Sequence, residues 1–387
     1  MIIRKLKPEE KYKCTALMGT AFNFSIDIEQ LKKELLDEDS YGAFGDDNET
    51  LMAQVVAKDY SAYVYGNEFG ALGIAGVSTY PQYRRNGCIR EIMKHLFEQS
   101  SANGWVLSYL YPFSFDYYRQ FGYERAFQQK SVRLPLKSLS RFPRYSDAVL
   151  YDSKELLPDL VEAYSKFAKT KNGMLTRTDY REWSSDPYKT LNYTYLFYDN
   201  NKIADGYINF RINSNTMVVN ELAYGSRSTL QNIFGFLRMY EGQYTEVLIN
   251  NVDIFSDIES YIGEFRGVSY GIYDGPMVRI IDVYKYLALV LKPFGEQSIN
   301  IKINDNYIQQ NNMTFKVISY DNKIDIVTTN EPHDVECDIS VFSTIATGSA
   351  MININNYLYF EGIDIKDKST IFFNMFPHVS MNQFDRF

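Results

Sequence analysis

The segment that most constrains the fold of this 387-residue chain is residues 69–102, which reads as a strand, a turn and a helix. Apolar residues alternate from Phe69 to Val77 and predict the strand. The helix is predicted from about Gly87 to Ala102 by apolar residues spaced three and four apart: Ile89, Ile92, Met93, Leu96 and Phe97. The turn between them therefore lies at a helix N-terminus, where backbone N–H groups have no intrahelical partner.

This turn carries two arginines and a glycine, Arg84, Arg85 and Gly87. Free N–H groups at a helix N-terminus bind phosphate oxygens well, because the helix dipole favours negative charge and glycine lets the ligand approach the backbone closely. The arginines add positive charge. The sequence thus predicts a phosphate site here, although an Arg-Arg-x-Gly turn by itself also fits a basic surface turn that caps an ordinary helix.

A second pattern follows at a fixed spacing. An apolar strand is predicted at residues 105–110, and residues 116–124 read Asp-Tyr-Tyr-Arg-Gln-Phe-Gly-Tyr-Glu. The spacing Gln82-x-Arg84-Arg85-x-Gly87 resembles the pyrophosphate-binding motif of the GNAT acetyltransferases. The downstream pattern resembles that family's strand, short helix and Tyr-x-x-Phe-Gly-Tyr closure. Two motifs in this order favour the resemblance over a coincidental basic turn.

The resemblance implies acetyl-CoA as co-substrate and assigns its binding to particular residues of this chain. They are Val77, Ser78, Thr79, Arg84, Arg85, Asn86, Gly87 and Cys88. In this assignment the turn holds the pyrophosphate, and main-chain groups of Val77 and Thr79 pair with the pantetheine arm and the thioester carbonyl. Two positions depart from the family pattern: Asn86 replaces the third basic residue of the turn, and Tyr111 stands where the family has a histidine.

Acetyl transfer to an amine needs an acid for the departing thiolate and a base for the ammonium. The resemblance implies Tyr118 as the acid. Its neighbour Tyr117 is the alternative, since only one of the two can face the cofactor on a short helix, and core packing is the alternative role for both. The strand at 69–77 contains no carboxylate or histidine, with Glu68 just outside it. The resemblance points instead to the C-terminal carboxylate of Phe387 as the base.

Length and composition bound the remaining organisation. A chain of 387 residues with 45% hydrophobic residues exceeds one compact core, so two or three domains are expected. Three widely separated cysteines argue against a disulfide framework and favour a reducing, cytoplasmic location. Three histidines leave little room for histidine-rich metal sites, and we expect no metal; His333 and Cys337 stand four apart without a second ligand pair. No apolar run is long enough for a membrane span.

The pattern of the first 145 residues starts again near Ala148, with strands and a helix in the same order but without the Arg-x-x-Gly spacing. We therefore predict a catalytic GNAT domain at 1–145 and a second, degenerate GNAT-like domain at 146–278. In the second domain Glu221 occupies the strand position where many GNAT enzymes have their base, and we expect a structural or interdomain carboxylate there. Residues 279–387 resemble the sterol-carrier-protein-like domain that ends the Eis-type (enhanced intracellular survival) acetyltransferases.

The predicted fold class is therefore α/β, with α+β mixed sheets, tandem GNAT-like domains and a final α+β domain. A net charge of −8 argues against nucleic acid and favours cationic partners. We expect an N-acetyltransferase acting on amines of small cationic molecules, such as aminoglycosides or polyamines, or on lysine side chains. An acceptor site lined by Phe22, Phe24, Asp27 and Glu29 is as compatible with the sequence as core packing there.

Two further expectations follow from the resemblance. It suggests a homo-oligomer, a trimer or hexamer. The alternative function is an acyl-CoA sensor or a lipid- or partner-binding protein with little turnover, and a continuous apolar tunnel in the C-terminal domain would favour it. Fold kinship alone does not decide between these functions.

Overall fold

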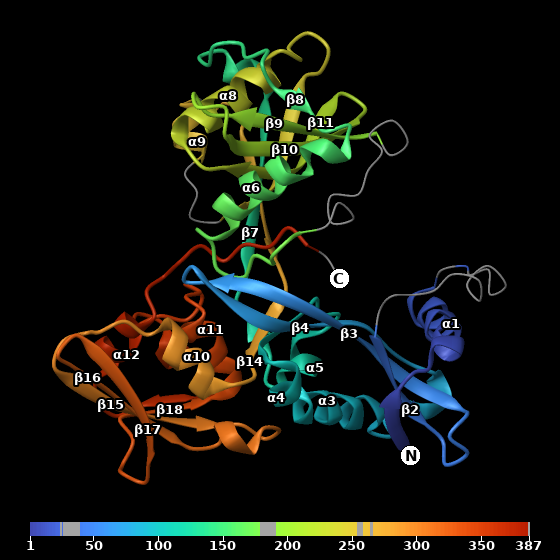
Figure 1. Cartoon of the computed structure of the whole chain (residues 1–387), viewed down its shortest axis with the longest axis vertical. Helices are drawn as coiled ribbons and strands as arrows, with labels where there is room; N and C mark the ends of the chain where they lie inside the picture. The colour runs from blue at the N-terminus through green and yellow to red at the C-terminus, as the bar shows by residue number, and fades with distance from the viewer. Residues whose placement is uncertain (24, 26–38, 179–190, 254–257, 264–265, 386–387) are drawn as a thin grey trace.

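The computed structural model describes the chain except for residues 24, 26–38, 179–190, 254–257, 264–265 and 386–387. Two seven-stranded sheets and one five-stranded sheet organise it into three lobes, seen in Figure 1 as two lobes side by side and one above them. The predicted mixed α/β architecture is confirmed. No described helix has the length and apolar character needed to cross a membrane.

The first lobe contains the sheet of order β1-β2-β3-β4-β5-β14-β6. Its strands are β1 (Ile2–Lys5), β2 (Asp39–Phe44), β3 (Leu51–Val64), β4 (Asn67–Thr79), β5 (Trp105–Leu110), β6 (Glu124–Arg125) and β14 (Met277–Ile280), and its helices are α1 (Lys11–Phe22), α3 (Cys88–Glu98), α4 (Ser100–Asn103) and α5 (Phe115–Arg119). β4 and β5 are parallel, with α3 crossing between them. The predicted helix at 87–102 is thus confirmed, interrupted at Gln99.

The second lobe contains the sheet of order β13-β7-β12-β11-β10-β9-β8. Its elements are β7 (Gln128–Pro135), β8 (Val149–Leu150), α6 (Leu157–Ala168), β9 (Asn192–Tyr198), β10 (Ala204–Asn213), β11 (Thr216–Tyr224), α8 (Arg227–Arg238), β12 (Glu246–Asp253), α9 (Ile258–Ile262) and β13 (Ser269–Asp274). β11 and β12 form a parallel pair with α8 between them, as β4 and β5 do around α3. The predicted repetition of strand and helix order is confirmed.

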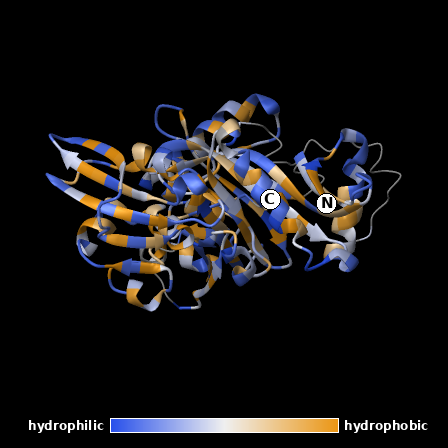
Figure 2. Ribbon diagram, turned by 90° about the horizontal axis from the view of Figure 1, so that it is seen from below, coloured by the Kyte–Doolittle hydropathy of each residue, from blue (hydrophilic) through white to orange (hydrophobic). Residues whose placement is uncertain are grey.

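The third lobe contains the sheet of order β17-β16-β15-β18-β19. Its elements are α10 (Val283–Val290), β15 (Gln297–Asn304), β16 (Thr314–Tyr320), β17 (Lys323–Thr329), β18 (Val335–Asp338), α11 (Ile339–Ala346), β19 (Ile363–Ile365) and α12 (Ser369–Met375). Figure 2 shows its strands banded with hydrophobic and hydrophilic residues, as expected for strands with one face on the core.

The first two sheets exchange strands with respect to chain order. The predicted division at residue 145 leaves β7 in the first domain, but β7 pairs with β12 and β13 of the second sheet. The apolar run that leads into α10 begins as a strand: residues 277–280 form β14, which returns to the first sheet and pairs with β5. The helix begins only after Asp282, whose side chain caps it through Lys285 N–H. A short apolar run does not distinguish buried strand from helix.

The first and third lobes share one hydrophobic core. Phe69, Val106 and Tyr109 of the first sheet belong to the same buried cluster as Ile301 and Phe342 of the third lobe. The second lobe has its own cluster around Phe197, Phe234 and Leu237. The inner face of the third sheet therefore packs against neighbouring elements instead of lining an open tunnel.

A buried ion pair explains the glycine of the Phe-Gly-Tyr motif. Arg279 of β14 and Asp305, which follows β15, are both fully buried and pair at 2.7 Å. Arg279 also donates through Nη1 to the Phe121 carbonyl, just after α5. Gly122 has a φ of +79°, and a Cβ there would overlap Arg279 Nη1 and lie 2.8 Å from Cγ2 of Ile339. The motif glycine thus leaves room for an arginine that ties α5 to the third lobe.

Gly122→Ala is expected to destabilise the protein by about 3 kcal/mol or more, because the methyl group disrupts a buried ion pair. Gly66→Ala is the matched control. Its φ of +77° is nearly the same, but a Cβ there meets nothing within 4 Å, so the expected loss is about 1–2 kcal/mol. Urea unfolding of both variants measures the difference. Equal losses would show that backbone strain, and not the contact with Arg279, requires the glycine.

Candidate active site

The first sheet opens where β4 continues beyond its neighbour. The pairing of β4 with β5 ends at Ile74 and Leu110, whereas β4 runs on to Thr79. Val77, Ser78 and Thr79 lie in this extension. Main-chain groups on the side of β5 are thereby available to a strand-like ligand, such as an amide-containing chain.

A β-bulge at Gly76 begins the extension. The register between β3 and β4 shifts at Gln54 and Val56, opposite Gly76, whose φ is +54°. The fully buried Gln54 side chain stabilises the bulge, since its Nε2 donates to the Gly76 carbonyl at 2.6 Å and to Ser78 Oγ at 3.0 Å. Glycine inside a strand commonly marks such a bulge. Gln54 carried no signal in the sequence.

The basic turn leads into α3 as predicted. Arg85 and Gly87 both adopt left-handed backbone conformations, with φ of +65° and +78°. Gly87 is the N-cap of α3, and no side chain hydrogen-bonds there to cap the helix. The first N–H groups of α3 are therefore free to bind an anion. In contrast, burial raises the pKa of the Cys88 thiol, which suits a packed thiol and not a nucleophile.

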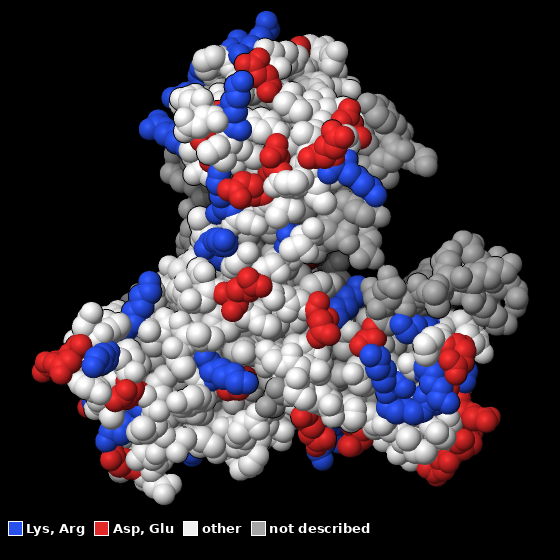
Figure 3. Space-filling model, in the orientation of Figure 1, with Lys and Arg blue, Asp and Glu red and all other residues white. Residues whose placement is uncertain are grey.

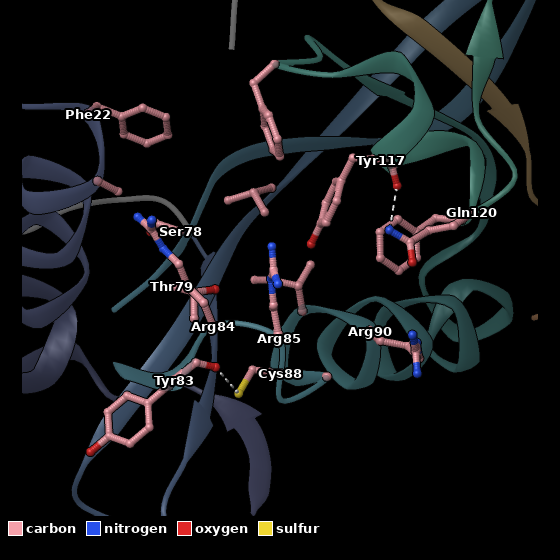
Figure 4. A pocket seen from close by; sticks show the side chains of 16 residues that line it. Phe22, Ser78, Thr79, Tyr83, Arg84, Arg85, Cys88, Arg90, Tyr117 and Gln120 are labelled. Carbon is pink, nitrogen blue, oxygen red and sulfur yellow. Dashed lines mark hydrogen bonds between the residues drawn. The ribbon is translucent and has the colours of Figure 1, made fainter. Parts of the chain in front are cut away.

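A cavity of about 790 Å³ joins the strand extension, the turn and α5. Most of the predicted cofactor-binding residues line it: Val77, Ser78, Thr79, Arg84, Arg85, Gly87 and Cys88. Asn86 is not among the lining residues. Figure 4 shows Arg84 and Arg85 between Phe22 of α1 and Tyr117 of α5. The structure thus brings together groups that lie nearly 100 residues apart in the sequence.

Three guanidinium groups, those of Arg84, Arg85 and Arg90, line this cavity. Within the described part of the chain, none of them forms an ion pair with a carboxylate. Arg90 interacts with the phenol of Tyr307 from the third lobe. On the face drawn in Figure 3, by comparison, acidic and basic side chains are interspersed. Arg90 was not among the predicted site residues, although its place in the first helical turn after Gly87 is a signal for it.

The two adjacent tyrosines of α5 have different surroundings. Tyr117 lines the cavity, whereas Tyr118 is 2% exposed and packs in the core of the first lobe. Burial raises the pKa of both phenols. Both hydroxyls therefore keep their protons at neutral pH, as a proton donor must. In this conformation the cavity favours Tyr117, the alternative to the predicted Tyr118.

Aromatic side chains border the cavity on both sides of the turn. Phe22 is 53% exposed and Phe113 is 68% exposed, and both line the cavity. Of the predicted acceptor residues, Phe24, Asp27 and Glu29 lie outside the described residues. An exposed aromatic pair beside a charged cavity can contact apolar or cationic groups of a substrate.

The predicted base, Phe387, also lies outside the described residues. Asp385, two residues before it, is the last residue that the structure describes. Tyr111, which directly follows β5, donates its hydroxyl to the Asp385 carbonyl at 2.8 Å. Glu68, the alternative base, is exposed near the opposite end of β4. Val77 lies nine positions further along the strand, about 30 Å away. The fold therefore carries the C-terminal segment, and not Glu68, toward the strand extension.

In the second lobe, the helix equivalent to α3 is α8, and its N-terminus is capped by side chains of the protein. Ser226 caps α8 by accepting from Thr229 N–H, and the Asp205 carboxylate accepts hydrogen bonds from the hydroxyls of Ser226 and Thr229. A carboxylate of the protein thus occupies the place that an anionic ligand would need. Glu221, the predicted structural or interdomain carboxylate, pairs with the buried Arg177 at 3.0 Å.

No group of three or more potential metal ligands occurs among the residues that the structure describes. His333 interacts instead with Lys366 at 2.8 Å and with Glu336 at 3.2 Å.

Comparison with known protein families identifies the class of enzyme. Residues 2–126 match one model of an acetyltransferase (GNAT) domain, and residues 173–280 match another. The chain therefore contains two tandem GNAT acetyltransferase domains, and the protein is an acyltransferase. No curated protein matched this sequence at a significant level.

Solved structures of the same fold extend over the whole chain. A conserved protein of Enterococcus faecalis V583, described as a probable N-acyltransferase, is 22% identical, with a TM-score of 0.86 over 100% of this chain and 99% of its own. A GCN5-related N-acetyltransferase of Anabaena variabilis is 18% identical, with a TM-score of 0.84 and full coverage of both chains. Eis1 of Mycobacterium abscessus is 17% identical, with a TM-score of 0.81 and full coverage. The three-lobed fold is thus shared with an Eis protein.

Proposed function

We propose that the protein transfers the acetyl group of acetyl-CoA to a primary amine of a small cationic molecule or of a lysine side chain. The observation that carries this proposal is the cavity in which an open strand edge meets an uncapped helix N-terminus and two arginines, neither of which pairs with a carboxylate among the described residues. This set of donors fits a pyrophosphate followed by an amide-containing arm. Bound there, acetyl-CoA would supply an activated thioester.

Each residue then has a role. Arg84, Arg85 and the N–H groups from Asn86 to Cys88 hold the pyrophosphate, and the main chain of Val77, Ser78 and Thr79 orients the pantetheine arm. Tyr118 donates a proton to the thiolate that leaves when the amine forms its bond to the acetyl carbon. The C-terminal carboxylate of Phe387 accepts the proton that the amine loses. Tyr117 is the second candidate for the acid, since it lines the cavity.

The remaining predictions stand as parts of this proposal. The domains follow the division 1–145, 146–278 and 279–387, except that β7 belongs to the second sheet and β14 to the first. The last domain is sterol-carrier-protein-like, and the protein is a cytoplasmic trimer or hexamer. The aromatic pair Phe22 and Phe113 and the net charge of −8 support a cationic acceptor. A binding protein with little turnover is the second function, but the buried inner face of the third sheet offers it little support: Ile299, Ile301 and Ile303 are fully buried.

The function is tested by incubating the purified protein and acetyl-CoA with separate aminoglycosides, polyamines and lysine peptides, and following thiol release. Turnover with at least one class of amine, and N-acetylation of that amine by mass spectrometry, are expected. Tight binding of acetyl-CoA without acceptor-dependent thiol release would favour the binding protein.

Deleting Phe387, or adding a few residues after it, is expected to reduce kcat about 10²-fold or more while acetyl-CoA binding persists, because the base is lost or displaced. The effect is measured by steady-state kinetics, with calorimetry for the cofactor. The same addition at the N-terminus is the control and should leave kcat unchanged. Full activity of the C-terminally extended protein would contradict the role of Phe387.

A further inference from the structure

The C-terminal segment is fixed between the lobes by a continuous series of contacts. Figure 1 shows it passing between the second lobe and the two lower ones. Asn172 and the segment exchange backbone hydrogen bonds, with Asn172 N–H to the Ser380 carbonyl at 2.9 Å and Asn382 N–H to the Asn172 carbonyl at 3.0 Å. Further along, Phe384 stacks on Phe167 of α6 with ring centroids 5.7 Å apart. The path of the segment is therefore determined up to its last described residue, Asp385.

Arg177 holds that last residue. Its side chain is 2% exposed and makes two hydrogen bonds to Glu221, from Nη1 and Nη2, at 3.0 Å each. Its Nε donates to Asp385 Oδ1 at 2.9 Å. Burial by itself would lower the pKa of the Arg177 guanidinium. The carboxylates of Glu221 and Asp385 have the larger combined effect, and the net pKa lies well above the ordinary value. The guanidinium is thus a permanent positive charge shared by two carboxylates.

The two ends of this contact belong to different lobes. Glu221 lies on β11 of the second lobe, and the Tyr207 hydroxyl of β10 donates to it at 2.5 Å. On the other side, the Asp385 carbonyl accepts from Tyr111 of the first lobe at 2.8 Å. Tyr111 is two residues from Phe113, which lines the cavity. Asp385 therefore has its side chain anchored toward the second lobe and its backbone anchored beside the end of β5.

We propose that Arg177 is a positioning residue for acetyl transfer. By holding Asp385 beside the end of β5, it fixes the point from which the last two residues start, and two residues span at most about 7 Å. The second lobe, whose own helix N-terminus is closed by Asp205, thus acts on the reaction in the first lobe through Glu221, Arg177 and Asp385. This inference rests on the proposed function, because it takes the carboxylate of Phe387 as the base.

Asp385→Asn tests the proposal with little risk to the fold. It removes one carboxylate from the contact, while Arg177 keeps Glu221 and Tyr111 keeps the backbone carbonyl. We expect kcat to fall about tenfold or more, with the Kd of acetyl-CoA unchanged. Asp274→Asn is the matched control, because it removes a carboxylate that pairs with a different arginine, Arg125, at 2.6 Å. With this variant kcat should stay within about twofold.

A second readout separates positioning from general stability. Carboxypeptidase digestion followed by mass spectrometry measures how firmly the segment is held, without any activity assay. We expect Asp385→Asn to release the C-terminal residues faster than the unchanged protein or Asp274→Asn does. Unchanged digestion, or faster digestion with unchanged kcat, would overturn the proposal.

A double-mutant cycle with the deletion of Phe387 completes the test. If Arg177 acts through the chain end, Asp385→Asn should cost nothing further once Phe387 is absent. Fully additive losses would overturn the proposal. If deletion of Phe387 alone leaves kcat unchanged, the assignment of the base fails, and the digestion rates still decide whether Arg177 holds the segment. Failure of the base and failure of the positioning contact are thus distinguishable.

Discussion

Arg84→Ala combined with Arg85→Ala is expected to abolish measurable acetyl-CoA binding while leaving the fold intact. Each charge-assisted contact to a phosphate contributes about 1.5–3 kcal/mol, so two contacts correspond to roughly a 10²- to 10⁴-fold loss of affinity. Both side chains are exposed, and within the described residues neither pairs with a carboxylate. Their removal should therefore not affect stability. Calorimetric titration with CoA and acetyl-CoA measures the loss.

Arg141→Ala combined with Arg144→Ala provides the matched control, since these two arginines are also exposed but lie away from the turn. Its affinity for CoA should equal that of the unchanged protein. Binding to the unchanged protein should also weaken as salt is added, and this dependence should be smaller after the Arg84 and Arg85 substitutions. Unchanged CoA affinity in the double variant would remove the assignment of the pyrophosphate site and, with it, the proposed function.

Tyr118→Phe is expected to lower kcat by roughly ten- to a thousand-fold, in the range for loss of one general acid, with little change in acetyl-CoA binding. Tyr117→Phe should have a much smaller effect. The measurement is steady-state kinetics of both variants with the same acceptor. Each substitution removes one hydroxyl and keeps the ring, so each variant is the natural control for the other.

The cavity makes this comparison decisive. Tyr117 lines it and Tyr118 is almost fully buried, so a larger effect of Tyr117→Phe would show that the described conformation is the reactive one and would transfer the acid to Tyr117. Because burial raises the pKa of both phenols, neither hydroxyl loses its proton below its ordinary pKa of about 10. Whichever tyrosine is the acid, its deprotonation should therefore not reduce kcat between pH 7 and 9. A fall in that range that Tyr→Phe abolishes would contradict the assignment.

Local features of the active site followed from the sequence alone. The apolar spacing from Ile89 to Phe97 determined α3, because a helix repeats every 3.6 residues wherever it packs. Gly87 and the two arginines indicated an anion site at its N-terminus, because the unpaired N–H groups belong to the helix itself. The strand end at Val77 to Thr79 and the turn with Arg84, Arg85 and Gly87 were therefore predicted as one binding site without knowledge of the remaining fold, and they line one cavity.

Only the tertiary structure decided how distant segments combine. β7 and β14 enter sheets that chain order does not suggest, because strand pairing depends on which edge is open and not on the strand's own pattern. Arg177 contacts Asp385 across 208 residues, and Arg279 fills the space beside Gly122. In both pairs, the sequence around one residue gives no indication of the other residue. The spacing of apolar residues along a helix or strand shows which of its faces is buried. The partner of a buried charge, in contrast, depends on how whole lobes pack together.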